Sequence, residues 1–274
     1  MNSPIPSVEH PPAVDGGPPR LRRGASLARV WQRLSPRLAR SAEQARFNVT
    51  SRAADMRCET GPDGLVLHIA YDIGNAAALP GEPTRICLVD VPAGGPLELA
   101  VDATADRAWL VIEGEAQIGG VRCAALDYQQ RSAGDSRVGL SSAHGARLML
   151  REARPGAPRP DGASAVHTTP ASQMVWQPLG DGISRRLLAP PQGAAAAYLV
   201  RMAAGAAAPA HRHGHAEECL LLSGEMYLDD VLLFGGDFQL ARAGGLHHEA
   251  SSAHGVLLVV HGDLDLDVVS PDPH

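Results

Sequence analysis

Short apolar runs separated by turn-forming residues dominate the chain after about residue 50. Examples are GLVLHIAYD (64–72), TRICLVDV (84–91), AWLVIEG (108–114), AYLVRM (197–202), ECLLLSG (218–224) and GVLLVV (255–260). These runs have the length of β-strands, and the Gly, Pro and Asp residues between them are typical of turns. Helical periodicity is absent from this region. The pattern predicts an all-β fold built from barrels or sandwiches.

The first fifty residues of the chain have a different composition and pattern. Residues 1–26 are rich in Pro and Gly and are predicted to be disordered. The spacing over 27–47 predicts a helix capped by Ser26, although Pro36 weakens that prediction. Such a helix would pack on the body or on a partner chain, or dock on a membrane, a nucleic acid or an acidic protein. Its apolar stripe is Leu27, Val30, Trp31, Leu34 and Leu38, flanked by Arg29, Arg33, Arg37 and Arg40.

The pentapeptide SSAHG occurs twice, at 141–145 and again 110 residues later at 251–255. At that offset Leu110 falls on Leu220, and about forty residues align without a gap. Asp127 and Asp237 are among the shared positions. A period of this length is a whole small domain rather than a solenoid unit. The sequence therefore predicts two copies of one domain, at 48–154 and 165–268, joined by a linker at 155–164.

Composition narrows the functional classes. All 24 basic residues are Arg, which excludes lysine Schiff-base chemistry, and the net charge of -6 argues against direct nucleic-acid binding. The four cysteines are scattered without a CxxC pair, which excludes a disulfide framework or a thiolate zinc site and favours a cytoplasmic location. No apolar run is long enough to predict a membrane span.

Residues that differ between the copies are where chemistry is expected. His211 and His213 are two apart and would share a face of a strand, and Glu217 keeps that parity. His247 follows later, and three imidazoles with one carboxylate can bind a divalent transition metal. The first copy has no such set. Its residues at the same offset are Val101, Ala103, Arg107 and Arg137.

These residues resemble the two signature motifs of the cupins, a superfamily of small β-barrels. Gly205, His211, His213, Glu217 and Gly224 match the first motif, and Gly236, Gly244 and His247 match the second; Arg242 and Ser251 replace the usual Pro and Asn. The resemblance implies two tandem cupin (double-stranded β-helix, or jelly-roll) barrels. It also implies one metal, held by His211, His213, Glu217 and His247 in the second barrel, and a degenerate first barrel.

Within the cupins, the chain is most similar to the ChrR-like group. The similarity is carried by MVWQPLGDGISRRLL (174–188) and HRHGHAEECLLLSGEM (211–226). The anti-sigma factor that gives this group its name binds zinc in its cupin and holds the sigma factor through an N-terminal His-x3-Cys-x2-Cys site. The N-terminal His-x3-Cys-x2-Cys motif does not occur in this chain. Other members of the group resemble non-haem metal dioxygenases.

Several neighbours of these residues have a structural and a functional interpretation. Strand parity favours Glu217 over Glu218 as the ligand. His215 is expected to be exposed, His248 to face away from the metal, and the repeated His144 and His254 to sit in turns. Cys219 would be a small buried residue or a redox-sensitive thiol near the metal. Four larger side chains are candidates for the core or for lining a cavity: Tyr198, Met202, Tyr227 and Phe238.

Three hypotheses for function follow. The first is a mononuclear metal oxygenase or isomerase for a small oxygen-rich molecule, in which Glu217 can also accept a proton. The second is a zinc-binding sensor or regulatory module of the anti-sigma type that responds to oxidants or a small ligand. Its basic N-terminal helix would contact a protein partner. The third is a cupin that binds a small molecule without turnover. The metal could be Zn, Fe, Mn or Ni. Cupins commonly form homodimers, and the degenerate copy could take the position of the second subunit within one chain.

Overall fold

The computed structural model describes residues 25–61, 63–74, 76–155, 166–191, 195–265 and 267–269. Helix α1 (Ala25–Gln44), up to Ala42, belongs to one compact unit, and its last two residues and the β-rich remainder from Glu43 onward belong to a second. The helix begins just before Ser26 rather than after it, and it continues through Pro36. Most of the predicted disordered tail (1–26) and the predicted linker (155–164) lie outside the described residues. Within the described ranges, no helix is long and apolar enough to cross a membrane.

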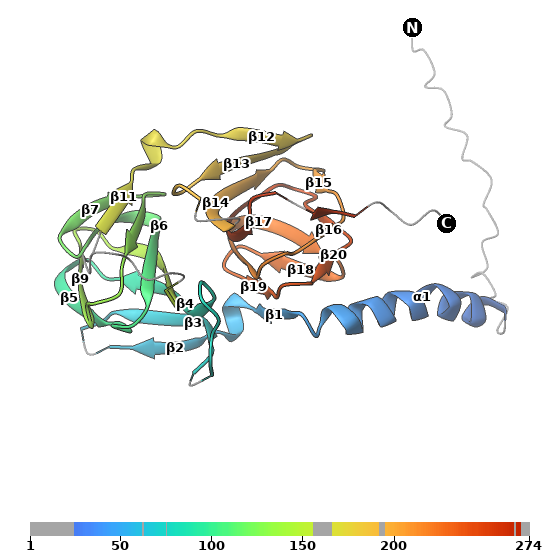
Figure 1. The fold of residues 1–274 in the computed structure, drawn as a ribbon, viewed down its shortest axis with the longest axis horizontal. Coiled ribbons are helices and arrows are strands. Elements are labelled where there is room, and N and C mark those ends of the chain that lie inside the picture. Colours follow the sequence, from blue (N-terminus) through green and yellow to red (C-terminus); the bar gives the residue numbers. More distant parts are fainter. Residues whose placement is uncertain are drawn as a thin grey trace, which may run out of the picture. The chain divides into compact units, whose positions relative to one another are not determined.

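The β-rich unit contains two similar sheets, each with a main path of seven antiparallel strands (Figure 1). The first has the order β11-β8-β6-β10-β4-β3-β2, and β5, β7 and β9 complete its barrel. Its strands are β2 (Arg57–Thr60), β3 (Val66–Asp72), β4 (Pro83–Val91), β5 (Gly94–Ala100), β6 (Asp106–Ile118), β7 (Val121–Ala124), β8 (Tyr128–Arg131), β9 (Arg137–Ser142), β10 (Ala146–Ala153) and β11 (Val166–Thr169).

The second sheet repeats this plan with the order β1-β19-β17-β22-β14-β13-β12. Its strands are β1 (Asn48–Ser51), β12 (Gln177–Gly180), β13 (Ile183–Leu187), β14 (Ala195–Met202), β15 (Ala207–Ala208), β17 (Glu217–Leu228), β18 (Val231–Phe234), β19 (Phe238–Ala241), β21 (Ala250–Ser251) and β22 (Val256–Asp263). A small third sheet joins β20 (Leu246–His247), β16 (His211–Arg212) and β23 (Asp267–Val268). The predicted all-β fold of two tandem barrels after a helix is confirmed.

The two copies exchange their first strands. Strand β1 precedes the first copy but pairs with β19 of the second, placing Asn48 opposite Ala241. Strand β11 precedes the second copy but pairs with β8 of the first, placing Thr169 opposite Tyr128 (Figure 1). Each barrel is therefore completed by a strand that leads into the other, which ties the two copies together.

The aspartates shared by the copies hold these exchanged segments. A short 3-10 helix follows each exchanged strand, η1 (Ala53–Asp55) and η2 (Ala171–Gln173). The Ala53 N–H donates to Asp237 Oδ1 at 2.8 Å, and the Ala171 N–H donates to Asp127 Oδ1 at 2.7 Å. Each aspartate thus anchors the entry segment of the other copy.

The repeated SSAHG segment has a structural role in both copies. The hydroxyl of Ser142 donates to the Glu115 carbonyl at 2.6 Å, and that of Ser252 donates to the Glu225 carbonyl at 2.7 Å. The last glycine of the second segment packs against a further glycine, because a Cβ on Gly224 would lie 2.1 Å from the Gly255 carbonyl oxygen. The pentapeptide therefore builds the turn before the last long strand of each barrel.

Three hydrophobic cores follow from the alternation along the strands. One fills the first barrel around Trp109, and one fills the second around Leu233. The third lies between the two sheets and draws on both copies, including the aligned pair Leu110 and Leu220. One face of each main sheet is thus buried in its own barrel and part of the other face against the opposite copy.

Candidate metal centre

The candidate ligands come from the short strands β16 and β20, the turn after β16 and the start of the long strand β17. His211 in β16 lies directly opposite His247 in β20, and Glu217 is the first residue of β17. His211, His213 and Glu217 each place a ligand atom within 4.8 Å of the others. The His247 ring centre lies 4.9 Å from that of His213 and 5.6 Å from that of His211. All four side chains are buried, so the structure brings together all four residues predicted from the sequence.

Two of the imidazoles are oriented by hydrogen bonds at Nδ1. His211 Nδ1 lies 2.9 Å from the Pro209 carbonyl oxygen, and His247 Nδ1 lies 3.0 Å from Asp229 Oδ2. A carbonyl or carboxylate partner requires the proton to sit on Nδ1, which leaves Nε2 as the lone-pair donor. This is the arrangement by which carboxylate and carbonyl groups prepare histidines for metal binding.

His213 is the residue whose surroundings fit a metal ion most directly. Both of its ring nitrogens are buried, and neither has a hydrogen-bond partner among the described residues. Glu217 Oε2 is 3.7 Å from its Nδ1. Burial lowers the pKa of His213 despite the opposing effect of Glu217, which favours the neutral imidazole that metal coordination requires. An unsatisfied buried imidazole is costly, so the donor set fits a metal ion.

The neighbouring carboxylates Glu217 and Glu218 point to opposite faces of β17. Glu217 lies with the imidazoles, whereas Glu218 accepts two hydrogen bonds of 2.7 Å from the Arg151 guanidinium in the other copy. Both members of that ion pair are buried. Strand alternation, which favoured Glu217 over Glu218 as the ligand, therefore agrees with the opposite surroundings of these two side chains.

Sequence reasoning missed two aspartates that support the site. Asp229, at a backbone φ of 54°, holds His247 and also accepts the backbone N–H groups of His248 and Glu249. Asp263 accepts the N–H groups of Gly214 and His215, which fixes the turn between His213 and Glu217. The copy comparison held the signal for Asp229, because Gly119 occupies its place in the first copy.

The other residues singled out near the candidate ligands lie at the surface, in turns or in the cores. His215 is half exposed and pairs with Asp263, and the N–H of the exposed His248 binds Asp229. His254 is exposed in its turn. Cys219 is buried beside Glu217, and burial together with that carboxylate raises its pKa well above the usual range, which disfavours a reactive thiolate. Phe238 packs in the core between the sheets and Tyr227 is exposed, so neither lines the second barrel's interior, unlike Tyr198 and Met202.

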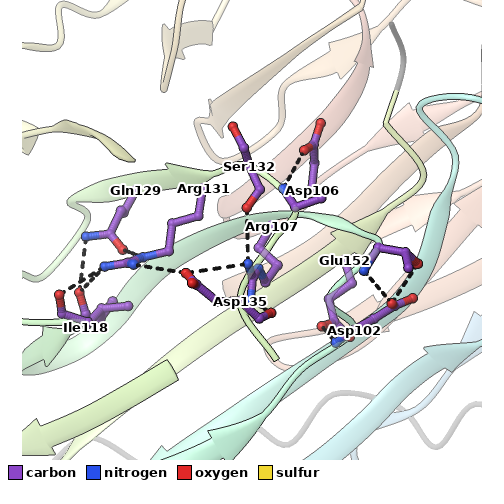
Figure 2. A network of polar contacts seen from close by, with 12 residues as sticks. Asp102, Asp106, Arg107, Ile118, Gln129, Arg131, Ser132, Asp135 and Glu152 are labelled. Carbon is purple, nitrogen blue, oxygen red and sulfur yellow. Dashed lines mark hydrogen bonds and ion pairs between the residues drawn. The ribbon is translucent and has the colours of Figure 1, made fainter. Parts of the chain in front are cut away.

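Two arginines occupy the corresponding region of the first barrel (Figure 2). Arg107, at the place of Glu217, is fully buried and donates to the carbonyl oxygens of Asp135 and Ser132. Arg131, at the place of Ala241, donates to Gln129 and to the Ile118 and Gly119 carbonyls. The Asp135 carboxylate lies 3.9 and 4.0 Å from the two guanidinium groups. Cationic side chains therefore lie where the second barrel gathers its candidate metal ligands.

Comparison with known proteins agrees with this arrangement. The profile described as the ChrR cupin-like domain matches residues 164–265. These residues are a ChrR cupin-like domain. The chain as a whole has the fold of two tandem cupin barrels, and the first barrel has Val101, Ala103, Arg107 and Arg137 at the positions of the candidate ligands. No curated protein matches the chain in sequence.

Solved structures share the bicupin fold at low identity. A quercetin 2,3-dioxygenase from Acinetobacter baumannii has a TM-score of 0.60 at 14% identity, covering 80% of each chain. The Escherichia coli pirin YhhW, in complex with nickel(II), has a TM-score of 0.57 at 12% identity, covering 78% of this chain and 98% of its own. The Lactobacillus farciminis oxalate decarboxylase, as a formate complex, has a TM-score of 0.58 at 10% identity, covering 81% and 88%. These likenesses show the fold alone.

Proposed function

We propose that the ChrR-like barrel binds one divalent transition metal through His211, His213, Glu217 and His247. We further propose that the chain acts as a mononuclear metal-dependent oxygenase-type enzyme on a small oxygen-rich molecule. The observation that carries the proposal is His213, a buried imidazole with two unpartnered nitrogens beside a carboxylate and two pre-oriented histidines. A nitrogen-rich set with one carboxylate suits Fe, Mn, Ni or Zn.

The roles of the residues follow from their environments. When bound, the metal would supply a Lewis acid or redox centre to a coordinated small molecule. The hydrogen bonds that His211 and His247 donate from Nδ1 to the Pro209 carbonyl and the Asp229 carboxylate hold the two rings in one orientation. Glu217 is the carboxylate within reach of the ligand cluster, and it would accept the proton that an acidic substrate hydroxyl releases. The fold shared with a quercetin 2,3-dioxygenase supports an oxygen-rich substrate class.

A second candidate function is a zinc-containing sensor or regulatory module. The ChrR cupin-like match supports it, and so does the amphipathic helix α1, on which Val30, Trp31, Leu34 and Leu38 are solvent-exposed. Trp31 is 60% exposed and lies on the same helix as Arg33. A basic helix with an uncovered apolar face is suited to docking on an acidic protein partner.

Metal analysis of the purified protein distinguishes these functions. We expect one metal ion per chain in the wild type and none in a His211→Ala, His247→Ala double variant. Iron, manganese or nickel, followed by oxygen uptake with enediol or flavonol substrates, would support the enzyme. Zinc that remains bound during dialysis, with no oxygen uptake, would support the sensor. A wild type that takes up no metal under any loading condition would refute the ligand assignment.

A further inference from the structure

A second chemically suggestive cluster lies in the first copy, on three adjacent strands. Cys58 in β2 stands opposite His68 in β3, and its Sγ is 3.1 Å from His68 Nδ1. The other ring nitrogen, Nε2, is 2.9 Å from Asp90 Oδ2 in β4. A thiol, an imidazole and a carboxylate therefore form a hydrogen-bonded chain, the relation that a nucleophile, a base and an orienting acid have in thiol enzymes.

The carboxylate end of this chain is fixed from the far side. Asp90 accepts two hydrogen bonds from the Arg147 guanidinium in β10, at 2.6 and 2.8 Å. Glu113 in β6 stands opposite Arg147 and completes the row of charged groups across the sheet. The hydrogen bonds from Arg147, opposed by partial burial and assisted by His68, lower the pKa of Asp90. An ionised Asp90 requires the proton of neutral His68 to be on Nε2, so that Nδ1 faces the thiol as an acceptor.

The second copy shows that the fold does not require these residues. His68 pairs with Leu88, and the equivalent pairing in the second sheet joins Arg186 to Leu199. By the same register Trp176 stands in place of Cys58 and Arg201 in place of Asp90. The three replacements stack, with the Arg186 and Arg201 guanidinium carbons 5.7 and 4.7 Å from the Trp176 ring centre. The same surface is therefore stable with entirely different chemistry.

The remaining cysteines have the opposite character. Cys58 is exposed, whereas the other three thiols are buried. Burial raises the pKa of Cys87 to about 12 and that of Cys123 to about 11. Because the thiolate is the reactive form of cysteine, a reagent in solution should distinguish Cys58 sharply from these three thiols.

We propose that Cys58 is a reactive thiol, activated by His68 and positioned through Asp90, that is oxidised by small hydroperoxides. The open sheet surface suits a small oxidant, which needs no cleft. His68 takes the thiol proton, and the thiolate sulfur attacks one peroxide oxygen. The S–O bond forms as the O–O bond breaks, and the leaving oxygen takes the proton from the imidazolium. Cys58 becomes a sulfenic acid and the hydroperoxide is reduced to an alcohol or to water.

Two measurements test the proposal on the full chain. The first is mass spectrometry after treatment with hydrogen peroxide and dimedone, a sulfenic-acid trap. We expect the label on Cys58 and not on Cys87, Cys123 or Cys219. The second is the rate of Cys58 alkylation by iodoacetamide between pH 6 and 10 in the wild type, His68→Gln and Asp90→Asn. Cys58→Ser is the blank in both assays, and unchanged metal content with unchanged far-UV circular dichroism shows that each variant is folded.

The expected effect is a change in the pH profile rather than a uniform loss. At pH 7 we expect His68→Gln to react about threefold more slowly, because Cys58 loses the neighbouring base that takes its proton. The rates should converge above pH 9.5, where any exposed thiol is ionised. The alkylation rate of Asp90→Asn at pH 7 should lie between those of the wild type and His68→Gln. Asp90→Glu should recover most of the wild-type rate. Identical pH profiles in the wild type and His68→Gln, or no dimedone label on Cys58, would overturn the proposal.

Discussion

The adjacent carboxylates Glu217 and Glu218 give a sharp test of the site, because the structure assigns them unrelated tasks. Glu218 forms a two-point ion pair with Arg151, and both side chains are more than nine-tenths buried. His261 also approaches Glu218, but burial, and then Arg151, lower its pKa well below the usual range, so His261 is neutral and adds no second cation. Glu218→Gln therefore leaves the Arg151 charge buried without its counter-ion. Breaking such a pair costs about 3–5 kcal/mol.

The measurement is urea unfolding together with metal content for Glu217→Gln and Glu218→Gln. Glu218→Gln should lower the free energy of unfolding by at least about 3 kcal/mol and still bind one metal per chain. Glu217→Gln should lose bound metal on dialysis, while the stability of its metal-free form stays within about 1 kcal/mol of the metal-free wild type. Each variant is the matched control for the other. Metal loss in Glu218→Gln with retention in Glu217→Gln would refute the assignment of the two faces.

Three further predictions use other parts of the fold. Gly224→Ala should destabilise the protein by about 2 kcal/mol more than Gly205→Ala in urea unfolding. Both glycines have a positive φ, but only at Gly224 would the added Cβ lie 2.1 Å from a backbone oxygen. Equal losses of stability in the two variants would contradict this close approach. Burial raises the pKa of Asp237, but N–H donors from Ala53 and Phe234 and the Arg52 guanidinium outweigh it, so the net pKa is lowered. This stabilisation is present above the unfolded value of about 3.9 and is lost as pH falls through the lower folded value. Asp237→Asn should thus cost about 1–2 kcal/mol at pH 7 and progressively less below pH 4 in pH-dependent thermal unfolding; a constant difference would contradict this. Finally, a chelator should lower the melting temperature of the wild type and leave His213→Ala unchanged, because only a folded site gains binding free energy from metal; an equal shift in both proteins would argue against His213 as a ligand.

The sequence predicted the fold class and the candidate ligands because both depend on local patterns. Alternating apolar residues define strands whatever their partners, and the spacing from His211 to Glu217 fits one short strand, a turn and the start of the next. Comparing the copies separated residues that build the barrel from residues that differ between the barrels. Asp229 fell among the differing residues too, but its contact with His247 depends on a turn at positive φ that spacing does not reveal.

The exchange of first strands could not be predicted from the same patterns. Strand β1 has only four residues, and its composition does not select between the edges offered by β8 and β19. The choice is made by tertiary contacts such as that of Ala53 with Asp237, and by Met56, which is buried in the core between the sheets. The domain limits at 48–154 and 165–268 stay a prediction about the chain, while the pairing shows that neither barrel is complete with only the strands of its own segment.

In the first barrel, arginines occupy the region where the second barrel gathers its candidate ligands. Removing Glu217 and the histidines from such a site would leave a polar region with unsatisfied groups, which is costly in a buried place. In the first copy Arg107 and Arg131 satisfy carbonyl oxygens around the same region (Figure 2). Gly119, the counterpart of Asp229, leaves the space, since a Cβ there would lie 2.0 Å from the Arg131 guanidinium. The two arginines are opposite in charge to Glu217 and Asp229, so a single Arg107→Glu substitution would not create a metal site in the first barrel. The second barrel therefore has to supply all of the ligands of the proposed centre.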